Sequence, residues 1–363
     1  MAKQQNNDMI KMGPEKATKA VDFMIRNKFN FLIVGAPGVA KTAIIEQGVK
    51  RAGQELIVFH PVISDPTDFK GMPAVLTAKM PVEQAKKELE DYGEQTKLLA
   101  KFVPFENLKR LLTATVPTVA FADDLGQAPP MVQAAWMQLV LARKLDDKVV
   151  SDNITFISAS NRKEDKAGVQ GILEPLKSRF VSIIELVSAH EEWLPWARKN
   201  DIHPYVRAFI KVRGAQFLYD FAPTNDMTNS ICPRTVEHAS KIMWGKPDSD
   251  IRPMLLAGAV GAAWATEFET FIKVVRNLPK MEAIVKSPDK CPVPPDSEPS
   301  AQYAIVEAMI DNTNSKSIAP FLTYIERFKP EFQQWYVSQI REIKPKCLRT
   351  TAFTKWAART GIK

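Results

Sequence analysis

Residues 35–42 read Gly35-Ala36-Pro37-Gly38-Val39-Ala40-Lys41-Thr42, directly after the apolar run 29–34 and directly before a helical pattern. A strand, a glycine-containing loop and a helix in this order are typical of a loop that binds phosphate. Gly35 and Gly38 let the backbone curl so that its N–H groups converge on phosphate oxygens. Lys41 adds a positive charge, and Thr42 offers a hydroxyl to Mg²⁺. The strict pattern has a second glycine where this chain has Ala40, but a turn that merely joins a strand to a helix would not need Lys-Thr. The stretch therefore predicts that residues 35–42 bind a nucleotide.

Apolar runs alternate with helical patterns through the first half of the chain. We expect strands over residues 29–34, 56–62, 119–122, 154–158 and 181–186, and helices over 41–51 and 131–141. Such alternation predicts an α/β fold, a parallel β-sheet covered by helices on both faces. Residues 65–112 look like an insertion on this core, with a loop at 65–73 and a charged helix at 82–99. After residue 186 the pattern is helical throughout.

The composition of the chain excludes several classes of protein. With 363 residues, 45% of them hydrophobic, there is room for two or three domains with substantial cores. The longest uncharged apolar stretch, 254–266, is shorter than the roughly 20 residues that span a bilayer, so we expect a buried helix there. Residues 1–13 lack the apolar core of a secretion signal. Three cysteines without a CxxC pair indicate a reducing compartment, and four histidines show no metal-ligand spacing. These features favour a cytoplasmic protein without membrane spans.

Two adjacent carboxylates close the apolar run 119–122. In a phosphoryl-transfer site, one acid at this point holds Mg²⁺ through water and the next polarises the attacking water. We assign Asp123 to the metal and Asp124 to the role of catalytic base. The usual second residue is glutamate, and aspartate is one methylene shorter, which is compatible with slow hydrolysis. The alternative is a pair of acids that opens a turn before Gly126.

Three further polar residues follow in the order that a phosphoryl-transfer site requires. Asn161 closes the stretch ISASN, and its amide can hydrogen-bond both the γ-phosphate and the lytic water. Arg179 lies within LKSRF, before the last expected strand, and Arg234 lies within CPRT, at the expected start of a helix. Arginine stabilises the charge of a transferring phosphoryl group, and one supplied by a neighbouring subunit makes hydrolysis depend on assembly. Each arginine alone would be an ordinary surface residue; the ordered set favours catalysis.

The series GAPGVAKT, VAFADD, ISASN, LKSRF and CPRT resembles the motifs of AAA+ ATPases and, within them, of the MoxR-type group that includes CbbQ- and NorQ-like proteins. The resemblance covers about residues 12–245. Alanine before the lysine, as at Ala40, is similar to what MoxR-type proteins carry. Asp124 departs from the family, which normally has glutamate there.

The resemblance implies an αβα sandwich with a five-stranded parallel sheet over residues 1–188, a helical lid over 189–247, and a further helical region over 248–363. Asn161 would be the sensor-1 residue, Arg179 the arginine finger and Arg234 the sensor-2 arginine, with Arg162 as a second finger candidate. The cofactors would be ATP and Mg²⁺. The resemblance also implies a ring, often a hexamer, that uses ATP to remodel or activate a partner protein, commonly one with a von Willebrand factor A domain.

The positive charge of the chain is concentrated at its end. Residues 341–363 contain seven lysines and arginines against one glutamate, so that they carry +6 of the net charge of +8. With Phe353 and Trp356 interleaved, this tail could bind nucleic acid or an acidic partner; a solvated helix face is the plainer interpretation. Two alternative functions follow: a DNA-associated AAA+ motor or regulator, from the tail, and a slowly hydrolysing ATP-dependent scaffold or switch, from Asp124.

Overall fold

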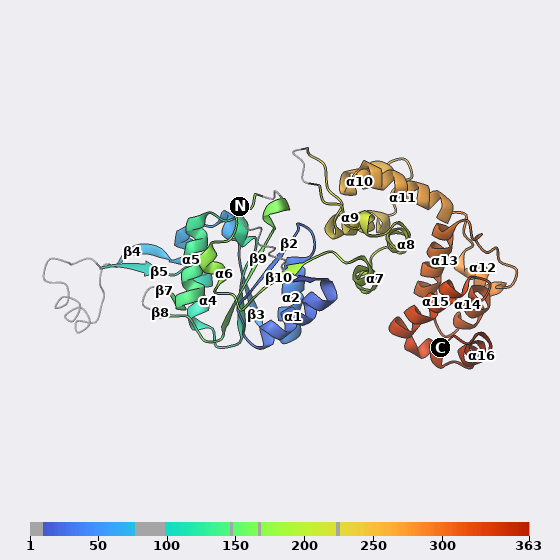
Figure 1. Ribbon diagram of the computed structural model, residues 1–363, viewed down its shortest axis with the longest axis horizontal. Coiled ribbons are helices and arrows are strands. Elements are labelled where there is room, and N and C mark those ends of the chain that lie inside the picture. The colour runs from blue at the N-terminus through green and yellow to red at the C-terminus, as the bar shows by residue number, and fades with distance from the viewer. Residues whose placement is uncertain (1–9, 77–98, 146–147, 166–167, 223–225, 363) are drawn as a thin grey trace, which may run out of the picture. The chain divides into compact units, whose positions relative to one another are not determined.

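The computed structural model describes residues 10–76, 99–145, 148–165, 168–222 and 226–362 (Figure 1). The chain forms two compact units, Met1–Val187 and Ser188–Lys363. The first contains the sheet, and the second contains helices and, within its described residues, no strand beyond an isolated bridge between Asp220 and Ile231.

The first unit is built on a parallel β-sheet whose strands, among the described residues, lie in the order β1-β10-β2-β9-β6-β3. The strands are β1 (Lys11–Met12), β2 (Phe31–Gly35), β3 (Glu55–Phe59), β6 (Thr118–Ala122), β9 (Ile154–Ser160) and β10 (Ser182–Leu186). β2, β6 and β9 are buried along their whole length, as expected for parallel strands covered on both faces. The predicted α/β fold is confirmed. The sheet has one strand more than the five expected, namely β1. The sequence did not predict β1, because a strand of two residues is too short to produce a recognisable pattern.

Helices cover both faces of this sheet. They are α1 (Pro14–Arg26), α2 (Lys41–Ala52), α4 (Glu106–Thr113), α5 (Pro130–Ala142) and α6 (Glu174–Lys177). Figure 1 shows α1 and α2 on one side of the sheet and α4, α5 and α6 on the other. The sheet is therefore the middle layer of an αβα sandwich.

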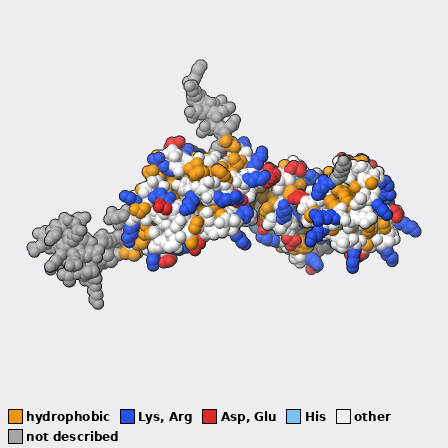
Figure 2. Space-filling view, turned by 90° about the horizontal axis from the view of Figure 1, so that it is seen from below, with side chains coloured by type: hydrophobic (Ala, Val, Ile, Leu, Met, Phe, Trp, Pro, Cys, Tyr) orange, Lys and Arg blue, Asp and Glu red, His pale blue; other side chains and the backbone are white. Residues whose placement is uncertain are grey.

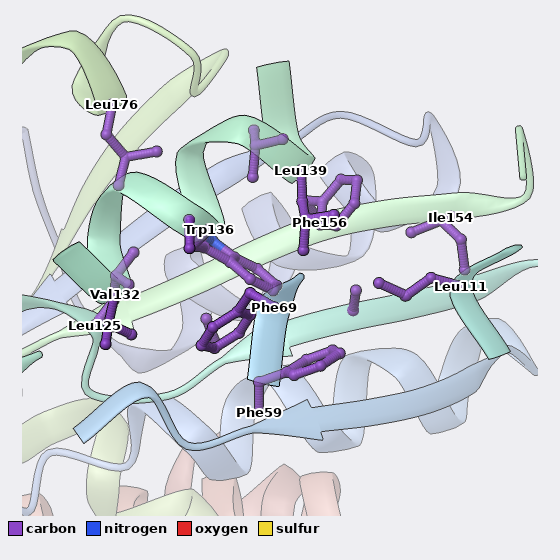
Figure 3. Packing of buried hydrophobic residues seen from close by; sticks show 14 of the residues in the cluster. Phe59, Phe69, Leu111, Leu125, Val132, Trp136, Leu139, Ile154, Phe156 and Leu176 are labelled. Atoms are coloured by element: carbon purple, nitrogen blue, oxygen red, sulfur yellow. The ribbon is translucent and has the colours of Figure 1, made fainter. Parts of the chain in front are cut away.

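Trp136 of α5 lies at the centre of the core between α5 and the sheet (Figure 3). Its ring centroid is 5.3 Å from that of Phe59, 5.8 Å from that of Phe69 and 5.4 Å from that of Phe156. The buried indole N–H donates a hydrogen bond to Ser158 Oγ at 3.1 Å. Aromatic rings at these distances pack favourably beyond the area they bury. This cluster fixes α5 against the strands on which the candidate site is built.

Short elements surround the main sheet. β4 (Met72–Leu76) pairs antiparallel with β5 (Leu99–Val103), and β7 (Lys144–Leu145) with β8 (Lys148–Val149). The short 3₁₀ helices are η1 (Pro61–Ile63), η2 (Pro66–Phe69), η3 (Leu125–Gln127) and η4 (Lys163–Asp165). The stretch 65–73, expected to be a loop, forms η2 and the start of β4. The helix expected at 82–99 lies outside the described residues up to 98, and Leu99 begins β5 instead.

The second unit consists of short helices arranged around two hydrophobic cores. They are α7 (His190–Lys199), α8 (Pro204–Arg213), α9 (Pro233–Trp244), α10 (Arg252–Val260), α11 (Ala262–Val275), α12 (Met281–Lys286), α13 (Pro299–Asn312), α14 (Ile318–Ile325), α15 (Pro330–Ile343) and α16 (Thr351–Thr360), with η5 (Ala215–Phe217) and η6 (Pro345–Arg349). α7 to α11 supply one core and α12 to α16 the other, while α13 contributes to both.

The single buried helix predicted over residues 254–266 is wrong. The stretch is divided at Gly261, whose φ of 112° ends α10 before α11 begins. Only glycine adopts such a backbone conformation without strain. Met254 is 73% exposed, so α10 is not buried on all sides. Within the described part of the chain, no helix is long and apolar enough to cross a membrane.

His203 caps the first turn of α8. Its Nδ1 accepts a hydrogen bond from the backbone N–H of Tyr205 at 3.2 Å, which requires the neutral ring. Burial lowers the pKa of His203, and Arg207 lowers it further, against the opposing effect of Asp311 and Asp201. The result is a pKa of about 4 instead of 6.5.

We expect the second unit to lose stability as the pH falls from 6.5 towards 4. Because the folded pKa of His203 lies below the unfolded one, its contribution is fully present above pH 6.5 and is lost as the pH falls through about 4. The difference between the two pKa values corresponds to at most about 3 kcal/mol in the free energy of unfolding. Urea unfolding of the parent and of His203→Asn, which keeps a capping acceptor but does not titrate, checks this. Equal pH dependence in both proteins would show that another group is responsible.

Candidate functional site

The loop 35–42 joins the end of β2 to the start of α2. A β-carbon on Gly35 would lie 2.6 Å from the carbonyl oxygen of Leu186 in β10, so only glycine fits there. Gly38 has a φ of 76° and Ala40 a φ of 75°, both in the left-handed region. This conformation costs alanine about 1–2 kcal/mol, which explains why glycine is usual at the second position. Ala40 has no side-chain oxygen, so no side chain caps the N-terminus of α2.

Lys41, the first residue of α2, is buried and bound to its own loop. Its Nζ donates hydrogen bonds to the carbonyl oxygens of Gly35 at 2.9 Å and Ala36 at 3.0 Å. It also donates to Asn161 Oδ1 at 2.6 Å. A buried ammonium group needs such partners. The positive charge is thereby held directly over the loop and beside the end of β9.

Thr42 and the paired acids meet at the end of β6. Thr42 donates its hydroxyl to Asp123 Oδ2 at 2.8 Å. The other oxygen of Asp123 accepts the backbone N–H of Asp124 at 3.0 Å. A hydroxyl beside a carboxylate is an oxygen-rich pair of the kind that Mg²⁺ prefers.

Asn161 connects the lysine to the second acid. While its Oδ1 accepts from Lys41, its Nδ2 donates to Asp124 Oδ1 at 3.0 Å. Asn161 is 8% exposed, so its amide is held in one orientation by these two partners. Asp124 has a φ of 53°, a left-handed conformation that aspartate tolerates better than most residues.

The strand order explains why these residues meet. β9 lies between β2 and β6, and all three run parallel. The loop that follows β2, the acids that follow β6 and Asn161 that follows β9 therefore share one edge of the sheet. In open α/β sheets this carboxyl edge is where ligands bind.

The three candidate arginines lie in different settings. Arg179 lies two residues beyond α6 and is exposed; its guanidinium makes no hydrogen bond or ion pair with any residue that the structure describes. Arg162 instead binds Asp165 at 2.7 Å and the buried Glu185 at 3.2 Å. The charge of Arg162 is thus neutralised by acids of its own unit, so that of these two candidates Arg179 is the one whose guanidinium is exposed.

Arg234 lies in the second unit, in the first turn of α9. The helix begins at Pro233, as the sequence predicts. Arg234 is exposed, and α9 has no acidic residue in its first turn. A cation at a helix N-terminus is unfavourable with respect to the helix dipole, so helix stability does not explain this arginine.

Gly126 and Gln133 support the acids and were not assigned roles from the sequence. A β-carbon on Gly126 would collide with Ser160 Oγ of β9. Gln133 is 1% exposed and hydrogen-bonds backbone groups on two segments. The sequence contains one signal that could have indicated a role for Gln133. It is a polar residue on the otherwise apolar face of the expected helix 131–141.

The basic tail is packed more closely than the sequence suggests. Trp356 is 3% exposed and belongs to the core of α12 to α16, so its ring is not available to stack on bases. Lys344 donates to the carbonyl oxygens of Ile310, Asp311 and Thr313 at the end of α13. Burial lowers the pKa of Lys344. The exposed cations of the tail include Arg341, Lys346, Arg349, Lys355 and Arg359.

A cavity of about 200 Å³ also lies in the first unit. Figure 2 shows one face of the molecule, on which lysine and arginine side chains, in blue, are scattered over the described residues. The cavity is lined by Phe69, Lys70, Ala135, Gln138, Leu139, Lys144 and Leu145. None of these residues belongs to the network around Lys41. The candidate chemistry therefore lies at the carboxyl edge of the sheet and not in this cavity.

No family model matches the sequence, and no curated protein matches it. Among solved structures, a mutant of Thermotoga maritima RuvB has a TM-score of 0.38 and 14% identity, and covers 76% of this chain and 74% of that one. Thermotoga maritima RuvB as a Holliday junction branch migration motor has a TM-score of 0.33 and 13% identity, with 96% and 87% covered. With TM-scores this low, these likenesses do not bear on the function of this chain.

Proposed function

We propose that this chain is an AAA+ ATPase of the MoxR type, which binds Mg-ATP at residues 35–42 and hydrolyses it. The observation that carries the proposal is the network of Lys41, Thr42, Asp123, Asp124 and Asn161 at one edge of the sheet. These residues provide a cation, a metal-side pair, a base and a polar sensor in one place. Phosphoryl transfer needs this combination of parts.

The loop fits a nucleotide phosphate chain. Because Gly35 has no side chain and no side chain caps α2, backbone N–H groups at the start of the helix can face an anion. Lys41 can exchange its bonds to two carbonyl oxygens for bonds to phosphate oxygens. Thr42 and Asp123 would hold Mg²⁺, which neutralises phosphate charge when bound.

Asp124 and Asn161 would act on the attacking water. Asp124 would accept its proton, and Asn161 would orient it, since the two side chains already share a hydrogen bond. The left-handed backbone of Asp124 favours aspartate over glutamate at this position. Its shorter reach supports the second candidate function, a slowly hydrolysing ATP-dependent switch or scaffold.

The exposed guanidinium of Arg179, which pairs with no residue that the structure describes, supports a site shared between subunits. We infer that Arg179 acts on a nucleotide bound by a neighbouring copy in a ring, as a hexamer would provide. Arg234 would contact the nucleotide from a lid at residues 189–247. The region 248–363 would adapt the ring to a client protein, for example one with a von Willebrand factor A domain.

The nucleic-acid alternative now rests mainly on charge, because Trp356 is buried and Phe353 is partly buried against the same core. Binding through the exposed tail cations would be salt-sensitive and independent of sequence. It should weaken when the exposed tail residues Lys346, Arg349 and Lys355 are changed to alanine, and unchanged binding would remove this alternative. The three unpaired cysteines are buried, in keeping with the cytoplasmic location we propose.

We expect ATP turnover per subunit to rise with protein concentration as rings form. Arg179→Ala should keep ATP binding and lose about 10³-fold or more in turnover, the range of an arginine supplied by a neighbour. Lys41→Ala should lose both ATP binding and ATP turnover. Arg276→Ala, which changes an exposed arginine of the second unit, is the matched control. Turnover per subunit that is constant with concentration and insensitive to Arg179→Ala would rule out a shared site.

A further inference from the structure

Gln133 joins two segments of the first unit that are far apart in sequence. Its Nε2 donates to the carbonyl oxygen of Ala128 at 3.1 Å and to that of Gly171 at 2.8 Å. Its Oε1 accepts the backbone N–H of Leu173 at 3.0 Å. Gln133 is almost fully buried, so water cannot replace these three bonds.

On one side, Gln133 holds the loop that begins at the candidate base. Asp124 directly precedes η3, and its carbonyl oxygen accepts the N–H of Gln127 at 3.0 Å. Ala128, the next residue, ends this turn and carries the carbonyl that Gln133 binds. The backbone between Asp124 and Ala128 is thus one hydrogen-bonded turn closed by the side chain of Gln133.

On the other side, Gln133 holds the start of α6. Leu173 is the residue that precedes this helix, and its carbonyl oxygen accepts the N–H groups of Leu176 and Lys177. The carbonyl oxygen of Leu176 in turn accepts the N–H of Arg179 at 3.0 Å. The helix is only one turn long, so its anchored start fixes the position of its end.

We propose that Gln133 is a positioning residue that fixes Arg179 relative to the acid loop of the same subunit. This inference rests on the proposed function, in which Asp124 works on the subunit's own nucleotide and Arg179 on a neighbour's. Gln133 bonds both segments at once, so that a movement of the acid loop is transmitted to the arginine. Glutamine is suited to this role because one side chain must donate to two carbonyls and accept from an N–H.

The test uses mixtures of full-length variants. Gln133→Met keeps the length of the side chain and removes all three hydrogen bonds. Alone, it should bind ATP as the parent does but hydrolyse it about 10–100-fold more slowly, because a small misplacement of a catalytic group has this effect. Mixed in equal amounts with Lys41→Ala, which cannot hydrolyse ATP but supplies a normal Arg179, its turnover per Gln133→Met subunit should rise towards half the parent value.

Two controls and one substitute variant separate the possible failures. Arg179→Ala mixed with Lys41→Ala must show the same recovery; if it does not, the proposed shared site is wrong. If that mixture regains turnover and the Gln133→Met mixture does not, the loss in Gln133→Met arises at the acid loop of its own subunit, and the proposed action through Arg179 is wrong. Gln333→Met removes a buried glutamine that bonds two carbonyls in the second unit, and it should hydrolyse ATP like the parent. If Gln133→Met does not fold, Gln133→Glu replaces it. This variant keeps the acceptor for the N–H of Leu173, and its turnover is measured alone and in the same mixture with Lys41→Ala.

Discussion

Asp124→Asn should lower ATP turnover by about 10²–10⁴-fold, the contribution of a general base, and leave ATP affinity nearly unchanged. Asparagine fills the same space as aspartate but cannot take a proton from water. The hydrogen bond from Asn161 Nδ2 to Asp124 Oδ1, 3.0 Å long, can form to an amide oxygen as well, so the architecture is preserved. Steady-state hydrolysis, together with titration of a fluorescent ATP analogue, measures the two quantities separately.

Asp123→Asn is the matched control, because it makes the same change one residue earlier. Asp123 accepts the hydroxyl of Thr42 at 2.8 Å, whereas Asp124 accepts from the amide of Asn161. We therefore expect the Asp123 variant to need more Mg²⁺ for half-maximal turnover. Parent-like turnover in Asp124→Asn would show that Asp124 is not the base. An increase in turnover in Asp124→Glu would favour the switch over the motor.

The sequence was sufficient to predict that several candidate site residues lie together at one edge of the sheet. Once the strands are parallel, the loop after residue 34, the acids after 122 and Asn161 must lie at the same edge. The sequence could not show that Asn161 bonds both Lys41 and Asp124, because that depends on the order of the strands. Nor could it separate Arg162 from Arg179, since one partner of Arg162 is Glu185 in β10, 23 residues further along the chain.

Two features of the fold that the sequence did not show have physical causes. The apolar run 254–266 has no charged residue to mark its division, so only the backbone conformation of Gly261 reveals two helices. Trp356 lies among lysines and arginines, and local composition does not show that its ring fills a core made by four other helices. The division of 254–266 and the burial of Trp356 both arise where tertiary packing, and not local pattern, determines the structure.

Glu307 of α13 is the centre of a buried charge network that joins α13 to α7 and α8. Arg198 of α7 binds its Oε1 at 2.5 Å, and Arg207 of α8 binds its Oε2 at 3.3 Å. Arg207 also binds Asp311, and Arg198 also donates to Gln339 of α15. The side chains of Glu307, Arg198 and Arg207 are at least nine-tenths buried. The network therefore ties the proposed lid to the region that follows it.

Glu307→Gln should destabilise the second unit by about 3–5 kcal/mol, because removing one partner leaves buried positive charge uncompensated. Arg207 keeps Asp311, but Arg198 loses its acid. Glu342→Gln is the matched control: Glu342 pairs with Lys199 between α15 and α7, but both side chains are well exposed, and such pairs contribute about 0–1 kcal/mol. Urea unfolding of the full chain, followed by tryptophan fluorescence, compares the two. Equal losses of stability in the two variants would mean that the buried arginines bind water or another acid when residue 307 is neutral. The network would then not hold these helices together.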